Sequence, residues 1–266
     1  MKIFPAFSGK VAVITGAGSG IGRALAQQLA ASGANLALSD VNQSGLDETV
    51  ASLVGAVKTT TYLFDVGDRS AYQDFVTQVV QDHEQVDIVI NNAGIVRLHS
   101  IEDGSYEDYQ KTFDINVWGV LYGCKEFLPY LKQSSRAWLV NLSSGAGIIG
   151  IANYSSYNMS KFAVRGLTES LRSELRDTRV QVCCVHPGGV NTNIVKAGIH
   201  SADAQTSVHK LASAIQQMSA DQAANIILSG MAKGKKRILV GRDVKILDMV
   251  ARLLPTAYDR LVAKYV

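Results

Sequence analysis

The 266-residue sequence predicts an α/β fold: a single domain built on a doubly wound, mostly seven-stranded parallel sheet with helices on both faces. Short apolar runs alternate with helical patterns along the chain, which is typical of strand–helix–strand units. Most of these runs are continuously apolar, as expected for parallel strands that helices cover on both sides. No linker, repeat or low-complexity segment divides residues 1–266, so one domain is expected.

The elements follow one another in regular alternation. Strands are expected at 10–15, 35–40, 58–64, 86–90, 136–142, 179–185 and 238–240. Helical patterns occupy 20–32, 43–53 with Asn42 as a cap, a segment opened by Asp68, 105–131, 154–176, and 219–231 with a capping-box pattern at Ser219 and Gln222. The pattern loosens over 193–218, which is expected to form a substrate-binding loop with a helix at 208–218. Residues 242–266 are expected to form a C-terminal helical tail, interrupted at Pro255.

Composition narrows the classes of function. The chain is 47% apolar and 18% charged, and its net charge of +3 is too small to indicate a nucleic-acid partner. It contains no apolar run of about 18 residues, so no transmembrane segment is expected. Three cysteines, Cys124, Cys183 and Cys184, form no disulfide framework. With no signal-peptide pattern at the N-terminus either, the expected location is the cytoplasm.

A glycine-rich turn follows the first expected strand and opens the first helix, in the run Thr15-Gly16-Ala-Gly18-Ser19-Gly20-Ile21-Gly22. Backbone N–H groups in such a turn can approach a diphosphate, with the positive end of the helix dipole behind them. Glycine allows that close approach because it has no side chain. A structural turn without a ligand is the alternative at this point.

Asp40 ends the second expected strand, at the edge where parallel sheets bind ligands. Its carboxylate can accept hydrogen bonds from an adenosine ribose and would repel a 2′-phosphate; the alternative is a simple turn-forming aspartate. Its expected neighbours Ser19, Ser39 and Val41 include no cation. The sequence therefore favours NAD(H), while Arg23 leaves NADP(H) open.

Three further residues suggest a reaction. Tyr157 and Lys161 lie four residues apart on an expected helix and so share a face, and Ser144 follows the fifth expected strand. A free phenol ionises near pH ~10, but a nearby ammonium lowers that pKa. Tyr157 is then a candidate general base for alcohol oxidation and acid for the reverse, and Ser144 can hydrogen-bond a substrate oxygen.

These motifs, with Asn91-Asn92-Ala93-Gly94, Asn141-x-Ser143-Ser144 and Pro187-Gly188-x-Val190-x-Thr192, make the whole chain resemble a short-chain dehydrogenase/reductase with a Rossmann fold. The resemblance implies a catalytic set of Asn116, Ser144, Tyr157 and Lys161. In that family the asparagine holds a water in a proton relay behind the lysine. Ser143 is the less favoured serine, and Tyr154 is excluded because Asn158 stands four residues later.

The resemblance also implies the residues that bind the nicotinamide dinucleotide. Asp65 and Val66 would contact adenine, Asn91 would lie beside the adenosine ribose, and Val190 and Thr192 would hold the carboxamide. With the turn, the sheet edge and the catalytic pair, the expected set is Gly16, Ser19, Gly20, Ile21, Asp40, Asp65, Val66, Asn91, Ala93, Gly94, Tyr157, Lys161, Pro187, Gly188, Val190 and Thr192.

No metal site is expected, because the five histidines show no ligand spacing; His99, His200 and His209 are at most candidates to line a substrate pocket. The reacting carbon is expected to be bordered by apolar side chains after Ser144 and after Thr192, namely Ile148, Ile149, Ile151, Ile194, Val195 and Ile199. The expected substrate is an apolar secondary, ring or lipid-like alcohol or its ketone. An NADPH-dependent carbonyl reductase and a non-catalytic dinucleotide sensor are the alternatives.

The tail at 242–266 has an apolar face with an excess of basic residues around it. Three roles compete: packing on a partner subunit, covering the substrate pocket, and peripheral contact with a membrane surface. The resemblance implies a homotetramer or homodimer assembled through the two long helices, around Trp118 and Phe162.

Overall fold

The computed structural model describes residues 2–191 and 218–258. Seven parallel strands form one sheet in the order β3-β2-β1-β4-β5-β6-β7, which confirms the expected fold class. The strands are β1 (Val11–Thr15), β2 (Asn35–Asp40), β3 (Thr59–Leu63), β4 (Ile88–Asn91), β5 (Ala137–Leu142), β6 (Val180–Pro187) and β7 (Arg237–Val240).

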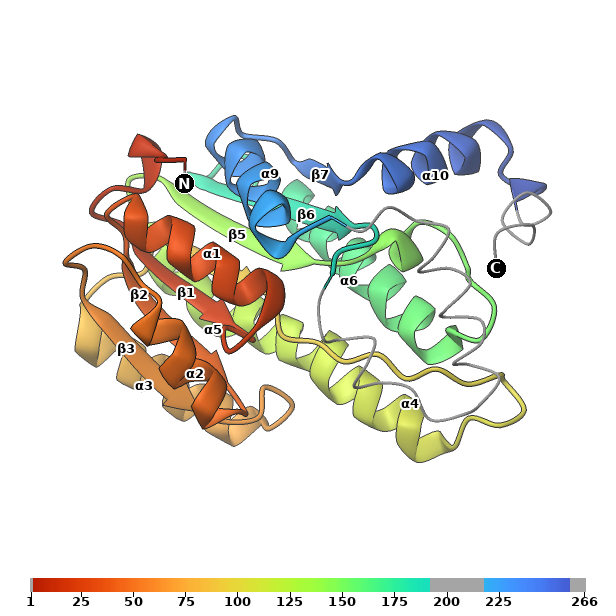
Figure 1. The fold of residues 1–266 in the computed structure, drawn as a ribbon, viewed down its shortest axis with the longest axis horizontal. Helices are drawn as coiled ribbons and strands as arrows, with labels where there is room; N and C mark the ends of the chain where they lie inside the picture. The colour runs from red at the N-terminus through yellow and green to blue at the C-terminus, as the bar shows by residue number, and fades with distance from the viewer. Residues whose placement is uncertain (1, 192–217, 259–266) are drawn as a thin grey trace.

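The order of the strands positions the site. The chain runs outward from β1 to β3 and then returns to place β4 on the other side of β1 (Figure 1). Such a reversal opens a crevice beyond the carboxyl ends of the two central strands, where doubly wound sheets bind their ligands. The glycine-rich turn follows β1, and the Asn91-Asn92-Ala93-Gly94 run begins at the last residue of β4.

Helices cover both faces of the sheet (Figure 1). Residues of α1 (Gly20–Ala31), α2 (Gln43–Ala51) and α9 (Ala220–Ala232) share one apolar core cluster with the sheet. Residues of α3 (Arg69–His83), α5 (Gly119–Gln133) and α6 (Ser155–Glu174) form the second cluster, on the other face. Strands buried on both sides explain the continuous apolar runs of the sequence.

Local hydrogen bonds set several helix starts. The Asn42 side chain accepts from the Gly45 N–H at 3.1 Å, and Asp68 accepts from the Ser70 and Ala71 N–H groups. Ser219 and Gln222 form the expected capping box, with both bonds at 3.2 Å. These three helix starts follow directly from short-range sequence patterns.

The expectation of one long helix at 105–131 is wrong in one respect, because the segment is not a continuous α-helix. It consists of α4 (Tyr106–Phe113), a π-helical turn η2 (Asp114–Trp118) and α5. Asn116 lies in the π-helical turn and is completely buried. Turns of this kind occur often at functional sites.

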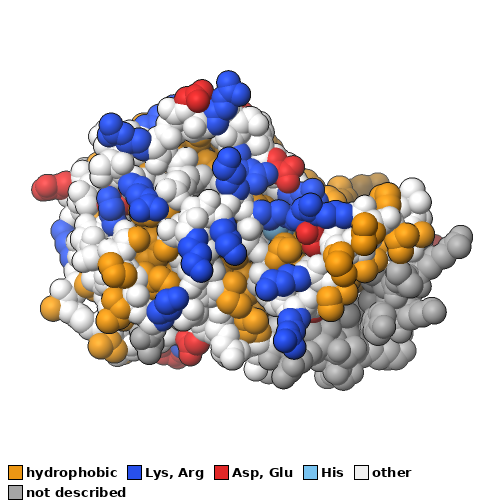
Figure 2. Space-filling model, turned by 90° about the horizontal axis from the view of Figure 1, so that it is seen from above, with side chains coloured by type: hydrophobic (Ala, Val, Ile, Leu, Met, Phe, Trp, Pro, Cys, Tyr) orange, Lys and Arg blue, Asp and Glu red, His pale blue; other side chains and the backbone are white. Residues whose placement is uncertain are grey.

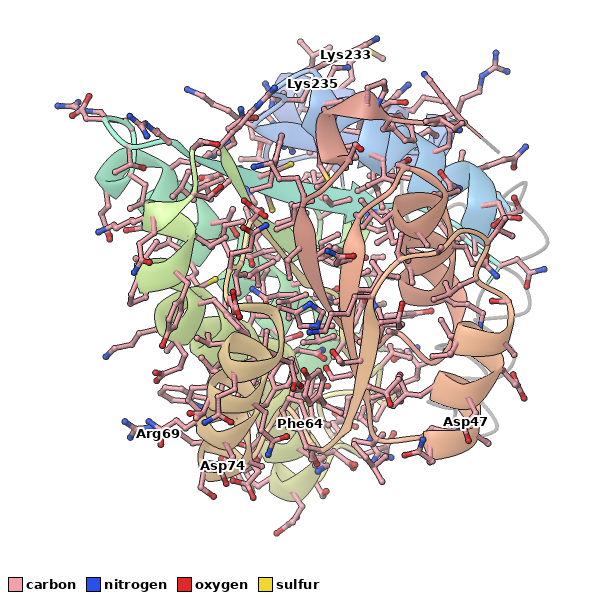
Figure 3. The ribbon with its side chains drawn as sticks, turned by 90° about the vertical axis from the view of Figure 1, so that its left-hand side faces the viewer. Asp47, Phe64, Arg69, Asp74, Lys233 and Lys235 are labelled. Carbon is pink, nitrogen blue, oxygen red and sulfur yellow. The ribbon has the colours of Figure 1, made fainter. Side chains whose placement is uncertain are left out.

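The described helix at the C-terminus covers only the first part of the tail expected at 242–266. Helix α10 (Arg242–Leu253) follows β7 along the upper edge of Figure 1 and ends just before Pro255. The side view in Figure 3 places Lys233 and Lys235, between α9 and β7, at this upper edge and Arg69 of α3 near the lower one. The expected loop at 193–207, the helix at 208–217 and residues 259–266 lie outside the described residues.

Within the described ranges, no helix is both long and apolar enough to cross a membrane. Across the same ranges, no cluster of three or more His, Cys, Asp or Glu side chains could hold a metal ion.

Candidate active site

The glycine-rich turn is packed so tightly that its glycines are required. A Cβ on Gly16, whose φ is +66°, would lie 2.8 Å from the Ala93 Cα atom, and a Cβ on Gly22 would overlap the Gly16 carbonyl oxygen. Helix α1 begins at Gly20, and the side chain of its N-cap Ser19 makes no capping hydrogen bond. The first N–H groups of α1 therefore face outward without a capping side chain, which suits a diphosphate.

Hydrogen bonds join this turn to the run after β4. Thr15 Oγ1 accepts from the Asn92 and Ala93 N–H groups at 3.1 Å, and Asn92 Nδ2 donates to the carbonyls of Thr15 and Gly16. Asn92 was not among the expected site residues, although it stands inside the motif. Its role is visible only once β1 and β4 are neighbours.

The Asn91 side chain points into the protein. It is 2% exposed, and its Nδ2 donates to Asn141 Oδ1 at 2.8 Å. A contact between Asn91 and a bound ribose would therefore have to come from the backbone. Asn141 in turn donates to Thr168 Oγ1 at 3.0 Å, so this buried pair ties β4 and β5 to α6.

Asp40 lies against the glycine-rich turn, as its position after β2 predicts. Its Oδ2 accepts from the Gly18 N–H at 2.8 Å, and its Oδ1 accepts from the Asn42 N–H at 3.0 Å. Arg23, the nearby cation, is engaged with Glu48 at 2.7 Å and with Thr49 Oγ1 at 3.0 Å. The carboxylate thus stands at the carboxyl end of β2 with no ion pair of its own among the described residues.

Asp65 and Val66 follow β3, at the same carboxyl end of the parallel strands as Asp40 and the glycine-rich turn. Burial alone would raise the pKa of Asp65, but hydrogen bonds from Lys111 and from the Gly67 N–H hold that pKa below its usual value. Val66 is 7% exposed and packs against Gly119, where an added Cβ would lie 2.9 Å from the valine.

The segment after β6 is fixed by α10. The Gly188 N–H donates to the Val240 carbonyl at 2.9 Å, and the Gly189 N–H donates to Asp243 Oδ2 at 2.7 Å. Pro187 ends β6, and Val190 forms a bridge with Met218. Thr192 lies outside the described residues.

The expected catalytic side chains meet at this edge. The hydroxyl of Tyr157, in the first turn of α6, is hydrogen-bonded to Ser144, which begins a short turn after β5. Lys161 Nζ lies 5.5 Å from the centre of the Tyr157 ring and donates to the Leu142 carbonyl at 3.0 Å. A Cβ on Gly94 would lie 3.3 Å from Lys161 Nζ and 3.1 Å from Asn116 Oδ1, so the space beside these two side chains is tight.

Burial is the largest influence on the pKa values of Tyr157 and Lys161. It raises the pKa of Tyr157, although the hydrogen bond from Ser144 acts in the opposite direction. Burial lowers the pKa of Lys161 to about 8, since the ammonium is 3% exposed and removed from water. Without a ligand, the pair therefore holds a neutral phenol beside an amine that titrates near neutrality.

Asn116 supports this group through the backbone. Its Nδ2 donates to the Ile95 carbonyl at 2.8 Å and to Ser160 Oγ at 3.0 Å, while its Oδ1 accepts from the Ile95 N–H at 2.8 Å. Both amide protons are thus used inside the protein. A relay water behind Lys161 would have to be held by other groups of the π-helical turn. Ser160, which the sequence analysis missed, also donates to the Tyr157 carbonyl.

Two buried histidines brace the site. His186 Nδ1 donates to the Ser144 carbonyl at 3.0 Å, and burial lowers the pKa of His186 to about 4. His99 Nε2 lies 3.3 Å from Ser156 Oγ, next to Tyr157, and the His99 ring contacts Tyr109. Both therefore act as structural supports, whereas His200 and His209 lie outside the described residues.

The expected apolar border is corrected in part. Ile148 and Ile149 are buried in a cluster with Val244 of α10, so they do not face the reacting group. Ile151 and Tyr157 both pack against a small cluster of Val96, Leu98 and Tyr154. Ile194, Val195 and Ile199 lie outside the described residues.

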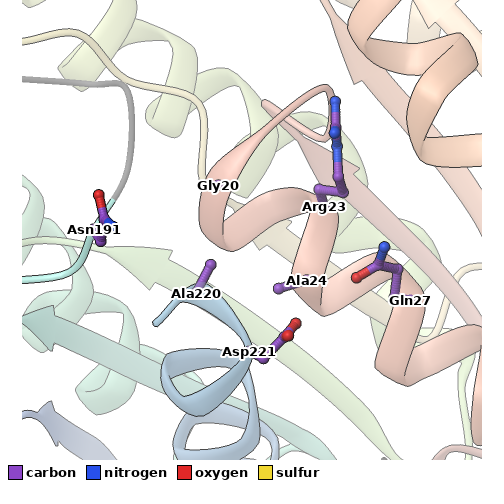
Figure 4. Close-up of a pocket in the computed structure, with 7 residues that line it drawn as sticks. All are labelled: Gly20, Arg23, Ala24, Gln27, Asn191, Ala220 and Asp221. Atoms are coloured by element: carbon purple, nitrogen blue, oxygen red, sulfur yellow. The ribbon is translucent and has the colours of Figure 1, made fainter. Parts of the chain in front are cut away.

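A cavity of about 290 Å³ lies on the outer side of α1 (Figure 4). It is lined by Gly20, Arg23, Ala24, Gln27, Asn191, Ala220 and Asp221. It contains none of the four expected catalytic side chains. This cavity adjoins the end of the glycine-rich turn at Gly20.

A seven-stranded parallel sheet with a glycine-rich turn after β1, and with Ser144, Tyr157 and Lys161 close together after β5, is the arrangement of an oxidoreductase. The family model for short chain dehydrogenases matches residues 10–203. The chain belongs to the short-chain dehydrogenase/reductase family.

Relatives support this assignment across the whole chain. The sequence is 43% identical to SadH of Mycobacterium tuberculosis, which is named an oxidoreductase, over 97% of this chain and 95% of that protein. It is 29% identical to human estradiol 17-beta-dehydrogenase 11, over 94% of this chain and 81% of that protein. A short-chain dehydrogenase/reductase from Burkholderia phymatum, solved in complex with NAD, superposes with a TM-score of 0.86 at 28% identity, covering 98% and 97% of the two chains.

Proposed function

We propose that the chain is an NAD(H)-dependent oxidoreductase that interconverts an apolar secondary, ring or lipid-like alcohol and its carbonyl compound by hydride transfer. The observation that carries this proposal is the contact of Tyr157 with Ser144 beside the buried ammonium of Lys161. The dinucleotide fits the residues present, because the first N–H groups of α1 have no capping side chain and Asp40 stands beside the glycine-rich turn. When bound, the nicotinamide supplies or accepts the hydride.

The side chains of the protein handle the proton. Ser144 orients the substrate oxygen toward Tyr157, and the Tyr157 hydroxyl takes the proton from an alcohol or gives it to a carbonyl oxygen. Burial opposes ionisation of the phenol, so a positive charge is needed nearby. Lys161 supplies that charge in its protonated form. Asn116 and Ser160 hold the backbone on which Tyr157 and Ile95 lie.

NAD(H) is the proposed cofactor because Asp40, at the carboxyl end of β2, accepts a hydrogen bond from the Gly18 N–H of the glycine-rich turn. A carboxylate there would repel a 2′-phosphate, and Arg23 is already paired with Glu48. We expect Asp40→Ala to narrow the preference for NAD⁺ over NADP⁺ by about tenfold or more, since a like-charge repulsion is removed. A wild-type enzyme that prefers NADPH would overturn this assignment in favour of a carbonyl reductase.

An apolar substrate is supported by the side chains next to the tyrosine. Tyr157 and Ile151 both pack against a cluster of Val96, Leu98 and Tyr154, and none of these side chains carries a charge. A relative named as an estradiol dehydrogenase agrees with a ring alcohol. A panel of alcohols and ketones with both cofactors tests the class; turnover confined to polyols or charged acids would contradict it.

The decisive variant is Tyr157→Phe. It removes the proton-carrying hydroxyl and keeps the ring, so turnover should fall about 10²–10⁴-fold. Binding of NADH, followed by its fluorescence, should be unchanged. Equal turnover in variant and wild type would exclude Tyr157 as the acid–base group. If the wild type binds NADH but turns over no member of the panel, the alternative of a non-catalytic sensor is favoured.

We further propose a cytoplasmic homotetramer or homodimer. Trp118 and Phe162, which are 45% and 39% exposed, lie on η2 and α6 and support assembly through these helices. The three cysteines are free and buried, which agrees with a reducing compartment. Light scattering on the purified chain measures the assembly, and a monomer would contradict it.

A further inference from the structure

Helix α10 presents two different faces. Its inner face packs on the body of the protein through Val244, which is fully buried, and through Leu247 and Ala251. These side chains contact Ile148 and Ile149, which follow the site serine in sequence. The inner face thus packs on the segment after Ser144, and the role proposed for the tail as a cover of the substrate pocket stays a prediction.

The outer face carries an exposed apolar stripe. Ile246, Met249 and Leu253 are 56%, 55% and 73% exposed, and Leu254 beside them is 45% exposed. Positions 246, 249 and 253 follow the i, i+3, i+7 spacing of one helix face. Most exposed apolar side chains of a soluble protein lie singly, so a stripe of this length is unusual.

No acidic side chain of α10 is free to face outward with this stripe. Asp243 accepts from the Gly189 N–H at 2.7 Å. Asp248 is held by both guanidinium nitrogens of Arg237, at 2.6 and 2.8 Å, and is only 13% exposed. Arg252 is exposed but also pairs with Asp248 at 3.2 Å, so the exposed charges left without an acidic partner on the helix are Arg242 and Lys245, both positive.

The same side of the molecule is basic beyond α10. Lys233, Lys235 and Lys236, between α9 and β7, are all exposed. Most of the charged side chains on the face seen from above are Lys and Arg, and apolar side chains lie across this face as well as toward the end where α10 lies (Figure 2). Figure 1 shows that α9, β7 and α10 run along this one edge of the molecule.

We infer that the outer face of α10, with the adjoining basic turn, docks on the surface of an anionic lipid bilayer. An amphipathic helix with an apolar stripe and basic flanks lies in the bilayer interface, where apolar burial and attraction to anionic lipids add together. The 12 residues of α10 span about 18 Å, enough to lie flat but too short to cross. This inference is independent of the reaction proposed above.

Charge decides between a bilayer and a second copy of the chain. A two-fold contact through α10 would place the Arg242 and Lys245 side chains of one copy close to the same basic face of the other. Like charges brought together in this way oppose association. An anionic surface instead complements every exposed charge on the helix.

The test is flotation of the full chain with vesicles of phosphatidylcholine alone and of an equimolar mixture with phosphatidylglycerol. We expect binding to the anionic vesicles and little to the neutral ones. Arg242→Gln with Lys245→Gln should lower the partition coefficient about 25-fold, at about fivefold for each positive charge removed. Met249→Ser with Leu253→Ser should also lower it, by about tenfold or more, because each exchange removes an inserted apolar group.

Matched controls lie elsewhere on the surface. Arg69→Gln removes one exposed charge at the opposite edge, and Val54→Ser removes an apolar side chain that is 66% exposed (Figure 3). Both should bind within twofold of the wild type, and all variants should keep its melting temperature. Failure of the wild type to float with anionic vesicles overturns the inference, as does equal binding by the α10 variants. A fall in oligomer size with Met249→Ser and Leu253→Ser, without vesicle binding, would assign the stripe to a second copy.

Discussion

Lys161 should weaken the fold at neutral pH while serving the reaction. Its ammonium is 3% exposed, and its described protein hydrogen bond goes to the Leu142 carbonyl. Burial lowers its pKa to about 8, against 10.5 for free lysine, and this gap corresponds to ~3 kcal/mol in the free energy of unfolding. Lys161→Met removes that cost and also removes the hydrogen bond, which contributes about 1–2 kcal/mol. The variant should therefore be more stable than the wild type by about 1–2 kcal/mol at pH 7.

The sign of this difference should reverse with pH. Below pH 8 both the folded and the unfolded wild type carry the proton, so the whole burial cost applies. Between about pH 8 and 10.5 the folded chain has released the proton and the unfolded chain has not, so the wild type gains ~3 kcal/mol relative to the variant. Above that window the variant should be the less stable protein, by about 1–2 kcal/mol, because it lacks the hydrogen bond to Leu142.

Urea unfolding of both proteins at several pH values between 7 and 10.5 measures this difference, without added cofactor and at equal chain concentration. Lys132→Met, at an exposed position near the end of α5, reports the effect of the same exchange at the surface. A difference between Lys161→Met and wild type that keeps one sign and size across the window would refute the argument. Turnover of the variant should be lost at every pH.

Two further outcomes follow from the packing around the site. Gly123→Ala adds a Cβ that would overlap Asn91 Oδ1 and lie 2.6 Å from the Tyr72 hydroxyl. The variant should therefore be less stable than the wild type by about 1–3 kcal/mol in a urea titration. The control Gly166→Ala, on α6, adds a Cβ that meets nothing within 4 Å, so its stability should be equal to the wild type or up to about 1 kcal/mol higher. Because burial lowers the pKa of His186 to about 4, the unfolded chain binds a proton there from about pH 6.5 downward and the folded chain does not. Wild-type stability should fall by up to ~3 kcal/mol more than that of His186→Asn between pH 6.5 and 4, and parallel curves would contradict this assignment.

The parts of the structure that follow from short-range patterns could be predicted from the sequence. The strands and the starts of α2, α3 and α9 are fixed by apolar runs and by caps within four residues. The sequence also placed Ser144, Tyr157 and Lys161 in one site. Ser144 follows a strand at the edge where parallel sheets bind ligands, and Tyr157 and Lys161 lie four residues apart on one helix.

The remaining features depend on neighbours that are distant in sequence. The π-helical turn at Asp114–Trp118 leaves the helical pattern of its own segment unchanged, and its Asn116 is held by Ile95 and Ser160. Ile148 and Ile149 look like pocket residues until α10 covers them. The inward direction of Asn91 is set by Asn141 on the neighbouring strand. Local sequence carries no signal for any of these contacts.

Lys161 affects both the stability of the fold and the proposed reaction. A lysine in the middle of a helix would normally face water, and its burial here costs stability that a methionine would not. The position is also crowded, since a Cβ on Gly94 would lie only 3.3 Å from Lys161 Nζ. A buried cation with one carbonyl partner is a poor way to stabilise a protein but an effective way to hold a positive charge beside a buried phenol. The conflict with local stability is thus confined to the place where the proposed acid–base role of Tyr157 requires that charge, as expected when a site is shaped by its reaction and stabilised by the surrounding sheet.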